Sequence, residues 1–271
     1  MDPVPSAEPW SSADAPAEGT PAERAAAAAA ATCLSLIERA GPACVAVKPQ
    51  LARFEALGAP GWAALEQTVA AAHDAGLLVI ADGKRGDVPV SAAAYGDALI
   101  GSTPTPWGEV PGLGADAVTL NALLGADSLE PIVERAAAAG AGIFVLVRTS
   151  NPGAADLLDL DAGGEPLHER IAAAVAALAD RLGGSGELSG AGAVVGATEP
   201  RFIARLRELM PRAILLLPGV GAQGGAADAL GPAFTSPASA LVTASRSVAG
   251  ADDPAAAAEE LRELAWSVAT A

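Results

Sequence analysis

Short apolar runs alternate with amphipathic stretches along most of this chain. Unbroken apolar runs are typical of parallel strands buried on both faces, and they occupy 43–48, 76–82, 115–120, 142–149, 192–196, 213–218 and 239–244. Amphipathic patterns between them predict helices near 60–75, 88–100, 127–139, 165–182, 199–209, 223–230 and 253–269. A further helix is predicted from Pro21 to about Ala40, because Thr20, Pro21 and Glu23 form a typical helix start.

This alternation predicts a parallel sheet, and at 271 residues a single (β/α)8 TIM barrel over 1–271 is favoured over an open sheet. The strand-like runs number seven, one fewer than a closed eight-stranded barrel needs. We therefore expect strand 1 to be missing at the N-terminus, through truncation or a wrongly assigned start codon. Residues 3–20 are rich in Pro, Ala, Ser and acidic side chains, which predicts a flexible loop.

Charge and composition restrict the partners and the compartment. The formal charge of −16 argues against nucleic acid and anionic membranes as partners, and no apolar run approaches the length of a membrane span. The N-terminus lacks the features of a signal peptide. Cys33 and Cys44 have no metal-ligand spacing and are expected to be buried thiols in a reducing cytoplasm.

The most informative motif is the charged run 81–87, Ala-Asp-Gly-Lys-Arg-Gly-Asp, directly behind the apolar run 76–81. Side chains alternate along a strand, so Asp82 and Lys84 are expected to point to the same face. Burying charges is costly unless they are paired, and a structural ion pair is the alternative to a functional one. Charges at the carboxyl end of a barrel strand favour a functional site.

Other strand ends carry polar residues as well. Lys48 ends the run 43–48, and Ser150 follows the run 142–149. The glycine-rich segment 219–225, which contains Gln223, follows one late strand, and Arg246 follows the next. Glycine-rich backbone and an arginine after the last two strands are typical of the phosphate pocket of such barrels, so Gln223 and Arg246 are predicted phosphate ligands.

Taken together, these motifs carry a resemblance to a known family. The D-x-K-R-G-D run, the V-K-P-Q strand end, the S-N-P-G turn, the P-G-V-G-x-Q-G-G loop and the terminal S-R-S stand in the order seen in orotidine 5′-phosphate decarboxylases. The chain resembles most the bacterial D-x-K-R-G-D branch, often called type 2. The resemblance covers nearly the whole chain from Asp2 onwards.

The resemblance implies a carboxy-lyase that converts orotidine 5′-phosphate to uridine 5′-phosphate, the last step of de novo pyrimidine synthesis, with neither metal nor organic cofactor. Lys84 resembles the residue that protonates C6 of the pyrimidine, and Asp82 the carboxylate that faces the scissile carboxylate. Lys48 and Asp87 complete an alternating Lys-Asp-Lys-Asp array. Asp87 is expected to reach the site of the neighbouring subunit, which implies a homodimer.

The same resemblance implies the substrate contacts. Asp2 corresponds to the acceptor of a ribose hydroxyl, Ser150 to the pyrimidine contact, and Gln223 and Arg246 to the phosphate ligands. Ser91 stands where the family usually has threonine and, with Asp87, is expected to act across the subunit interface.

Two other functions stay open at this point. A metal-dependent 3-keto-sugar-phosphate decarboxylase or hexulose-phosphate synthase of the same superfamily would need further acidic ligands at strand ends, and a non-catalytic phospho-ligand-binding protein would not need the retained charges. His73 and His168 fall in helical stretches, which favours neither catalysis nor metal binding. Asn121 either contacts ligand or fixes a loop, and Arg148 either lines the site or balances nearby carboxylates.

Overall fold

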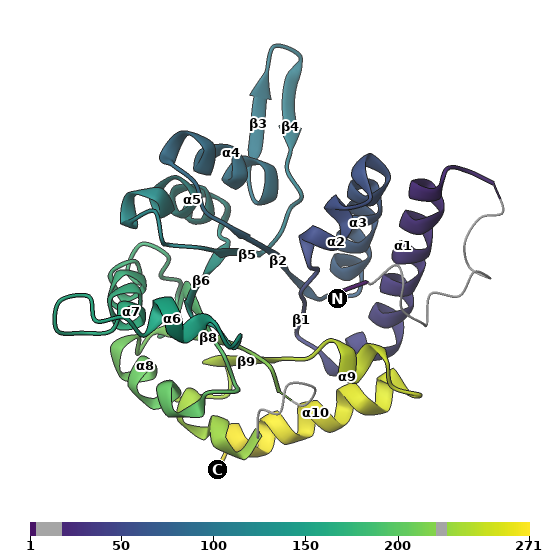
Figure 1. The fold of residues 1–271 in the computed structure, drawn as a ribbon. Coiled ribbons are helices and arrows are strands. Elements are labelled where there is room, and N and C mark those ends of the chain that lie inside the picture. The colour runs from purple at the N-terminus through teal and green to yellow at the C-terminus, as the bar shows by residue number, and fades with distance from the viewer. Residues whose placement is uncertain (4–17, 221–226) are drawn as a thin grey trace. The chain divides into compact units, whose positions relative to one another are not determined.

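The computed structural model describes residues 1–3, 18–220 and 227–271 (Figure 1). These residues form two compact units. Unit 1 contains Met1–Gly83, Leu113–Asp116 and Ser245–Arg262, and unit 2 contains Lys84–Gly112, Ala117–Ala244 and Glu263–Ala271. The boundary falls within strand β2 (Leu78–Arg85) and again within helix α10 (Pro254–Ala269). Both units are therefore assembled from segments that alternate along the chain.

Unit 1 is built around a packed pair of helices, α1 (Pro21–Ala40) and α3 (Gly58–Asp74). The predicted start of α1 is confirmed: the Thr20 hydroxyl accepts from the backbone N–H of Glu23, and the Glu23 carboxylate accepts from the backbone N–H of Thr20. Alanines and Cys33 form the buried face of α1, so a narrow helix face lies against its neighbour. Unit 1 also contains the 3-10 turn η1 (Gly41–Ala43), α2 (Leu51–Glu55) and α9 (Arg246–Ala249).

The strands of unit 1 are β1 (Ala46–Val47) and the first part of β2, which pair in parallel. Ala46 lies opposite Leu78 and Val47 opposite Val79. The same register continues beyond β1 as a single bridge between Gln50 and Asp82. This register fixes which residue after β1 lies next to the charged run of β2.

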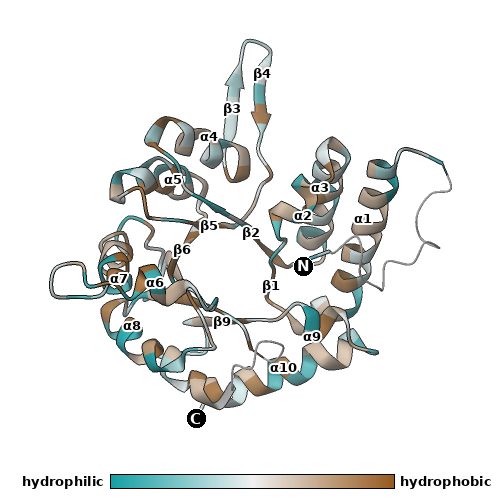
Figure 2. Ribbon diagram, viewed as in Figure 1, coloured by the Kyte–Doolittle hydropathy of each residue, from teal (hydrophilic) through white to brown (hydrophobic). Residues whose placement is uncertain are grey.

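Unit 2 contains a parallel sheet whose strands pair in chain order: β5 (Ala117–Leu120), β6 (Gly142–Arg148), β7 (Ser189–Val195), β8 (Ala213–Pro218) and β9 (Ala240–Thr243). All four residues of β5 and most of β6, β7 and β8 are buried. Figure 2 shows the apolar character of β5 and β6 beside the mixed surfaces of the helices. Burial on both faces explains why these strands read as continuous apolar runs.

Helices separate these strands, as the sequence predicts. They are α4 (Pro89–Leu99), α5 (Ala126–Ala139), α6 (Ala154–Leu158), α7 (Leu167–Ala177), α8 (Ile203–Leu209), preceded by the 3-10 turn η2 (Pro200–Phe202), and the 3-10 helix η3 (Ala227–Ala233). Within the described residues, seven strands pair in parallel, two in unit 1 and five in unit 2. The fold class is that of the α/β barrel, and these strands account for seven of the usual eight.

Several local predictions differ from the structure. The segment 102–111, for which no element was predicted, forms a hairpin of β3 (Ser102–Thr105) and β4 (Gly108–Pro111). The predicted helix 223–230 is a 3-10 helix over Ala227–Ala233, and 223–226 lie outside the described residues, as does most of the predicted loop 3–20. β2 continues to Arg85, three residues beyond the predicted end, so Asp82, Lys84 and Arg85 belong to the strand itself.

A buried arginine joins α8 to the amino-terminal edge of the unit 2 sheet. Arg207 is 6% exposed, and its guanidinium donates to the carbonyl oxygens of Ala233, Met210, Ala213 and Ser239 at 2.7–3.1 Å. Burial lowers the pKa of Arg207 to about 10. Carbonyl oxygens at the starts of β8 and β9 and at the end of η3 thus share one cation, which satisfies backbone groups that would otherwise be buried without a donor.

We expect Arg207→Met to lower the free energy of unfolding by at least about 3 kcal/mol, because it leaves several buried carbonyl oxygens without a donor. Arg212→Met is the matched control, since Arg212 is 38% exposed and bridges Asp180 at the surface. Its loss is expected to stay within about 1 kcal/mol. Urea unfolding measures both changes, and equal losses would show that the carbonyl cluster contributes nothing particular.

Candidate active site

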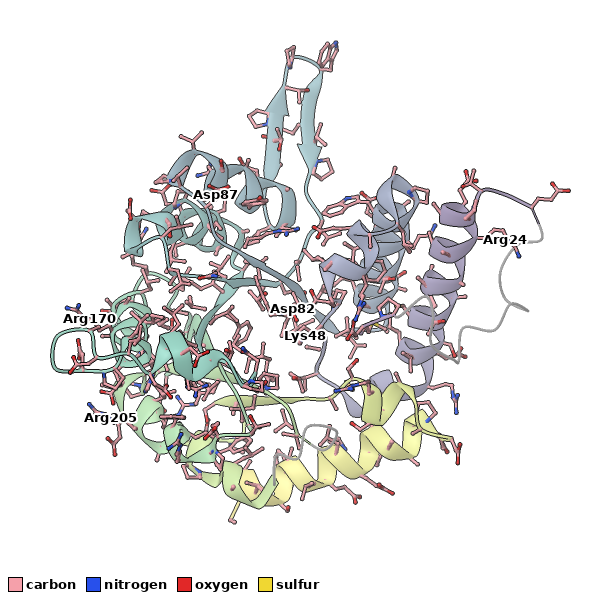
Figure 3. All side chains as sticks on the ribbon, viewed as in Figure 1. Arg24, Lys48, Asp82, Asp87, Arg170 and Arg205 are labelled. Atoms are coloured by element: carbon pink, nitrogen blue, oxygen red, sulfur yellow. The ribbon has the colours of Figure 1, made fainter. Side chains whose placement is uncertain are left out.

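A short ion pair lies where β1 ends beside β2 in unit 1. The Lys48 Nζ and the Asp82 Oδ2 are 2.5 Å apart, and the two side chains are 23% and 5% exposed (Figure 3). Gln50 Nε2 also donates to Asp82 Oδ2, at 3.3 Å. A carboxylate this buried is stabilised by the ammonium and the amide that contact it. The structure thus brings together Lys48 and Asp82, two members of the array that the resemblance implies, and their roles stay a prediction.

The strand register explains this pair. The backbone N–H of Asp82 donates to the Pro49 carbonyl at 3.0 Å, so residues 48–50 run alongside the charged part of β2. Pro49 lacks an N–H, which suits a position where the strand β1 has already ended. The ammonium of Lys48 therefore reaches Asp82 from a neighbouring strand, at the distance of a direct hydrogen bond.

The first residues of the chain lie beside the same segment. The Met1 ammonium donates to the Lys48 carbonyl at 2.7 Å, and the Gln50 N–H donates to the Met1 carbonyl at 2.9 Å. Burial, and secondarily the Lys48 ammonium, lower the pKa of the Met1 amino group to about 6. Asp2, the predicted ribose contact, accepts from Arg53 Nε at 2.7 Å. Because Met1 is hydrogen-bonded to the backbone of Lys48 and Gln50, the next residue, Asp2, lies near Lys48.

Lys84, the first residue of unit 2, has a left-handed backbone with φ 48°. It is the one non-glycine residue with positive φ in the described ranges. Such a conformation costs a residue with a Cβ about 1 kcal/mol or more, and it persists only where neighbouring contacts hold it. One of them is the Lys84 N–H, which donates to the buried Thr119 hydroxyl at 2.8 Å. The prediction that the Asp82 and Lys84 side chains point to the same face assumed an extended strand. Because the Lys84 backbone is not extended, the alternation of side chains does not hold through this position.

The residues after Lys84 are fixed by β5. The Asn121 N–H donates to the Arg85 carbonyl at 2.7 Å, and a Cβ on Gly86 would lie 2.7 Å from the Asn121 carbonyl oxygen. The second glycine of the charged motif is therefore required by close backbone approach. The Arg85 guanidinium lies 5.3 Å from the centre of the Tyr95 ring. The Asn121 side chain accepts from the Leu123 N–H at 3.0 Å, so it shapes its own turn.

Asp87 and Ser91 lie together at the start of α4. Asp87 precedes the helix and its carboxylate accepts from the Val88 N–H at 2.7 Å, while Ser91 is in the first turn. A carboxylate at this end of a helix is favoured by the helix dipole. Both residues thus belong to unit 2 together with Lys84.

The predicted pyrimidine and phosphate contacts come from other elements. Ser150 directly follows β6 and Thr149 in unit 2. Arg246 is the exposed first residue of α9 in unit 1. Gly219, which opens the predicted phosphate loop, has φ 104°, a conformation that favours glycine. Gln223 lies outside the described residues.

The described ranges contain no group of three or more His, Cys, Asp or Glu side chains placed to hold a metal ion. His73 contacts Asp116 at 3.0 Å in unit 1, and His168 is buried in unit 2. The sequence analysis missed Thr119 and Gln50. A threonine in a run that is otherwise apolar is a signal for the first, but nothing in the sequence shows that Thr119 accepts from Lys84.

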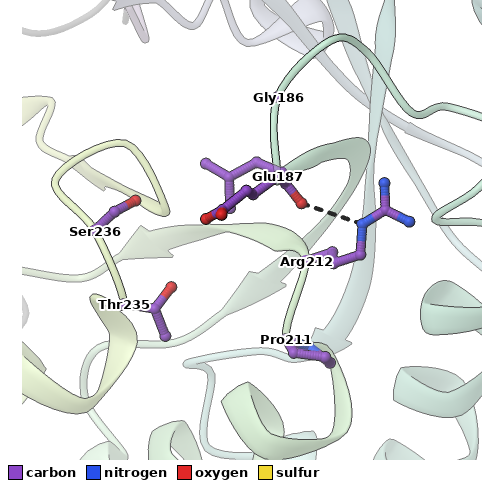
Figure 4. A pocket seen from close by; sticks show the side chains of 7 residues that line it. Gly186, Glu187, Pro211, Arg212, Thr235 and Ser236 are labelled. Atoms are coloured by element: carbon purple, nitrogen blue, oxygen red, sulfur yellow. Dashed lines mark hydrogen bonds between the residues drawn. The ribbon is translucent and has the colours of Figure 1, made fainter.

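A pocket of about 530 Å³ lies at the amino-terminal edge of the unit 2 sheet, where β7, β8 and β9 begin (Figure 4). It is lined by Gly186, Glu187, Leu188, Pro211, Arg212, Thr235 and Ser236, which precede β7, β8 and β9. Arg212 Nε donates to the Glu187 carbonyl at 3.1 Å within it. None of the predicted site residues in the described ranges lines this pocket.

Comparison with known proteins decides the family. The profile of the orotidine 5′-phosphate decarboxylase / HUMPS family matches residues 13–261. The chain belongs to this family. It is 47% identical over 217 residues to the orotidine 5′-phosphate decarboxylase of Deinococcus radiodurans, covering 79% of this chain and 75% of that one. With the enzyme of the same name from Rhodopirellula baltica it is 44% identical over 221 residues, 80% and 71% of the two chains.

Solved structures of the orotidine 5′-phosphate decarboxylase family agree with this assignment. A putative orotidine-monophosphate-decarboxylase from Toxoplasma gondii superimposes with a TM-score of 0.79 at 30% identity, covering 96% of this chain and 90% of that one. The resemblance drawn from the motifs is therefore confirmed at the level of the family, and the bacterial branch within it stays a prediction. No helix in the described part of this family member is both long and apolar enough to cross a bilayer.

The strain at Lys84 predicts an unusual response to glycine. Lys84→Gly is expected to be more stable than Lys84→Ala by about 1 kcal/mol, because glycine adopts positive φ without a Cβ penalty. At the neighbouring Arg85, whose φ is not positive, the order should reverse, with alanine more stable by about 0.5 kcal/mol or more. Thermal or urea unfolding of the four variants measures this. The same order at both positions would contradict a strained Lys84.

Proposed function

We propose that this chain decarboxylates orotidine 5′-phosphate to uridine 5′-phosphate. The observation that carries the proposal is the partly buried ion pair between Lys48, which follows β1, and Asp82 on β2. The next charged residue of β2, Lys84, is held in a strained conformation. Only Gly83 separates Asp82 from Lys84. Strained backbone and buried paired charges concentrate at functional sites, and here they coincide with the motif that this family shares.

In the proposed reaction, the bond between C6 and the carboxylate carbon breaks, CO2 leaves, and the electron pair stays on C6. The Lys84 ammonium then donates a proton to C6, and the resulting amine takes a proton from solvent. An ammonium about 4 Å from the developing charge stabilises it by roughly 4 kcal/mol at an effective dielectric constant near 20. In this scheme Lys84 both stabilises the carbanion and ends its lifetime.

Asp82 is proposed to face the scissile carboxylate. Two like charges brought together in a water-poor site repel each other, and the repulsion ends when the substrate carboxylate leaves as neutral CO2. Lys48 holds the Asp82 carboxylate in one orientation through the 2.5 Å contact. The proposal thus assigns Lys48 an electrostatic role.

The substrate contacts are proposed from their positions in the chain. Asp2 would accept a ribose hydroxyl, Ser150 would contact the pyrimidine, and Gln223 and Arg246 would bind the phosphate. Arg246 is exposed at the start of a short helix, and Gly219 opens the loop that contains Gln223. A phosphate bound away from the reacting bond supplies binding energy that can lower the barrier.

The proposed reaction needs no metal and no organic cofactor, and this separates it from the metal-dependent sugar-phosphate enzymes of the superfamily. We expect purified protein to convert orotidine 5′-phosphate to uridine 5′-phosphate at the same rate with and without EDTA, followed by the loss of substrate absorbance. Activity that EDTA abolishes would favour a metal-dependent sugar-phosphate enzyme. Binding of uridine 5′-phosphate without turnover would favour a non-catalytic binding protein.

Lys84→Ala is the decisive variant in this assay. We expect at least about a thousandfold loss of kcat, since the proton donor and the cation next to C6 are both removed, while uridine 5′-phosphate still binds. Lys84→Gly serves as its partner without backbone strain and should be equally inactive. Activity above a tenth of the unsubstituted enzyme in either variant would remove Lys84 as the proton donor.

We propose further that the enzyme is a homodimer in which Asp87 and Ser91 reach the partner's site. Their shared position at the start of α4, next to the exposed Val88 and Val90, supports this. The proposed partners are thus a nucleotide substrate and a second copy of the chain. Nucleic acid and membranes are not proposed as partners. Of the two thiols predicted to be buried, Cys33 is buried and Cys44 is exposed. Neither is in a disulfide, which suits a reducing compartment such as the cytoplasm.

The dimer proposal predicts complementation. Chains with Asp87→Ala and chains with Lys84→Ala are each expected to be inactive, and mixing them should restore activity, because one site of each mixed dimer then has both residues intact. Statistical exchange predicts up to about a quarter of the original activity, from one intact site in half of the dimers. No recovery after subunit exchange has been verified by mass spectrometry would show that Asp87 acts within its own chain.

A further inference from the structure

The end of β6 carries a buried arginine that the proposed chemistry does not use. The Arg148 side chain is 4% exposed. Its Nε and Nη2 donate to the two carboxylate oxygens of Asp159 at 2.8 and 3.1 Å, and its Nη1 donates to the Thr149 carbonyl at 2.6 Å. The guanidinium also lies 4.8 Å from the centre of the Phe202 ring. The planar fork of arginine suits this bidentate, stacked arrangement, and lysine could not reproduce it.

These contacts close a loop. Thr149 is the first residue after β6, and Asp159 follows α6, so the segment 149–159 leaves Arg148 and returns to it. One guanidinium holds both ends of that segment. His168 adds to the far end: its Nδ1 lies 2.8 Å from the Leu158 carbonyl and 3.2 Å from Asp159. A carbonyl can only accept, so this ring nitrogen carries the hydrogen.

Ser150 lies at the start of this loop, and its backbone is fixed from several sides. The carbonyl that Arg148 binds belongs to the peptide that joins Thr149 to Ser150. The Gly196 N–H donates to the Arg148 carbonyl at 2.7 Å, and a Cβ on Gly196 would lie 2.9 Å from the Ser150 Cα. Gly196, directly after β7, thus lets the backbone of Ser150 approach closely. Arg148 fixes the orientation of the peptide between Thr149 and Ser150.

We infer that Arg148, together with Asp159, is a positioning residue that holds Ser150 for recognition of the pyrimidine. The alternative is that the guanidinium binds the substrate itself. Its buried side chain, its bidentate contact with Asp159 and its contact with the Thr149 carbonyl favour the indirect role. The Arg148 hydrogen bond also keeps the pKa of the Asp159 carboxyl below its ordinary value, so this carboxylate stays charged at neutral pH. The inference rests on the proposed function, since Ser150 is the proposed pyrimidine contact.

The test compares two ligands that share a phosphate and a ribose. Uridine 5′-phosphate has the pyrimidine and ribose 5-phosphate lacks it, so the dissociation constant of ribose 5-phosphate divided by that of uridine 5′-phosphate isolates recognition of the base. In Arg148→Met we expect this ratio to fall about tenfold, mainly through weaker uridine 5′-phosphate binding, because a small displacement of a positioning contact is costly. Ribose 5-phosphate affinity should be unchanged. Calorimetry on folded protein measures both constants.

Arg201→Met is the matched control. Arg201 lies on the same ring, 4.6 Å from the centre of Phe202, but its ion pair is with Glu199 and it is 69% exposed. The ratio of dissociation constants should not change there. Asp159→Asn keeps the side-chain shape and removes the charge, so it offers a second route if Arg148→Met does not fold; its ratio should also fall. Arg148→Lys should restore only part of the loss.

The outcomes separate the two levels of the proposal. If the unsubstituted protein binds uridine 5′-phosphate no better than ribose 5-phosphate, the proposed function fails. If it does discriminate, and folded Arg148→Met and Asp159→Asn keep the full ratio, Arg148 has only a structural role and the inference is wrong. A fall in the ratio for Arg201→Met as large as that for Arg148→Met would also overturn it, because stacking on Phe202 alone would then be sufficient.

Discussion

The parallel register between β1 and β2 is the constraint on which the charged residues of unit 1 depend. Opposing Val47 to Val79 places residues 48–50 beside Asp82, and the Lys48 ammonium then meets the buried carboxylate. A shift of one residue would turn Lys48 away and leave Asp82 buried without a cation. Because an isolated buried carboxylate is costly, the ion pair and the register stabilise each other. The chemistry proposed for this family member is thus set by strand pairing before any substrate binds.

The Lys48–Asp82 ion pair and the fold stabilise each other, whereas the backbone conformation of Lys84 destabilises the fold. Its positive φ opposes folding, and the hydrogen bond to Thr119 is among the contacts that hold it. Glycines elsewhere take up the unusual backbone conformations of the described ranges at no such cost. A lysine stands at a position whose backbone conformation favours glycine, which is the relation expected when the side chain is needed for function and not for folding.

Much of the fold could be predicted from the sequence because its strands are buried on both faces and α1 starts with a clear signal. The Thr20 capping box and the run 213–218 match the structure residue for residue. The hairpin at 102–111 could not be predicted from hydrophobic periodicity, since nearly all its residues are exposed and its prolines interrupt a strand pattern. The extension of β2 to Arg85 was also missed, because charged residues were taken to mark the end of the strand.

The candidate site shows a similar division. The motif residues Lys48 and Asp82 were found because charges after apolar runs stand out, and the family resemblance gave them roles. The supporting residues could not be found this way: Asp159 reaches Arg148 through eleven positions of chain, and Gln50 reaches Asp82 through a strand register that only the structure supplies. Arg148 itself was noticed, but its role stayed open until its partners were known.

The interleaved composition of unit 1 has a consequence for how the protein is made. Unit 1 consists of Met1–Gly83, the short piece Leu113–Asp116 and Ser245–Arg262, so its last segment is synthesised only after Ala117–Ala244 of unit 2. Unit 2 has almost all of its residues before that point. Unit 1, which contains Lys48 and Asp82, is therefore completed only after most of unit 2 has been synthesised, although α1 and α3, which pack against each other, are both made early.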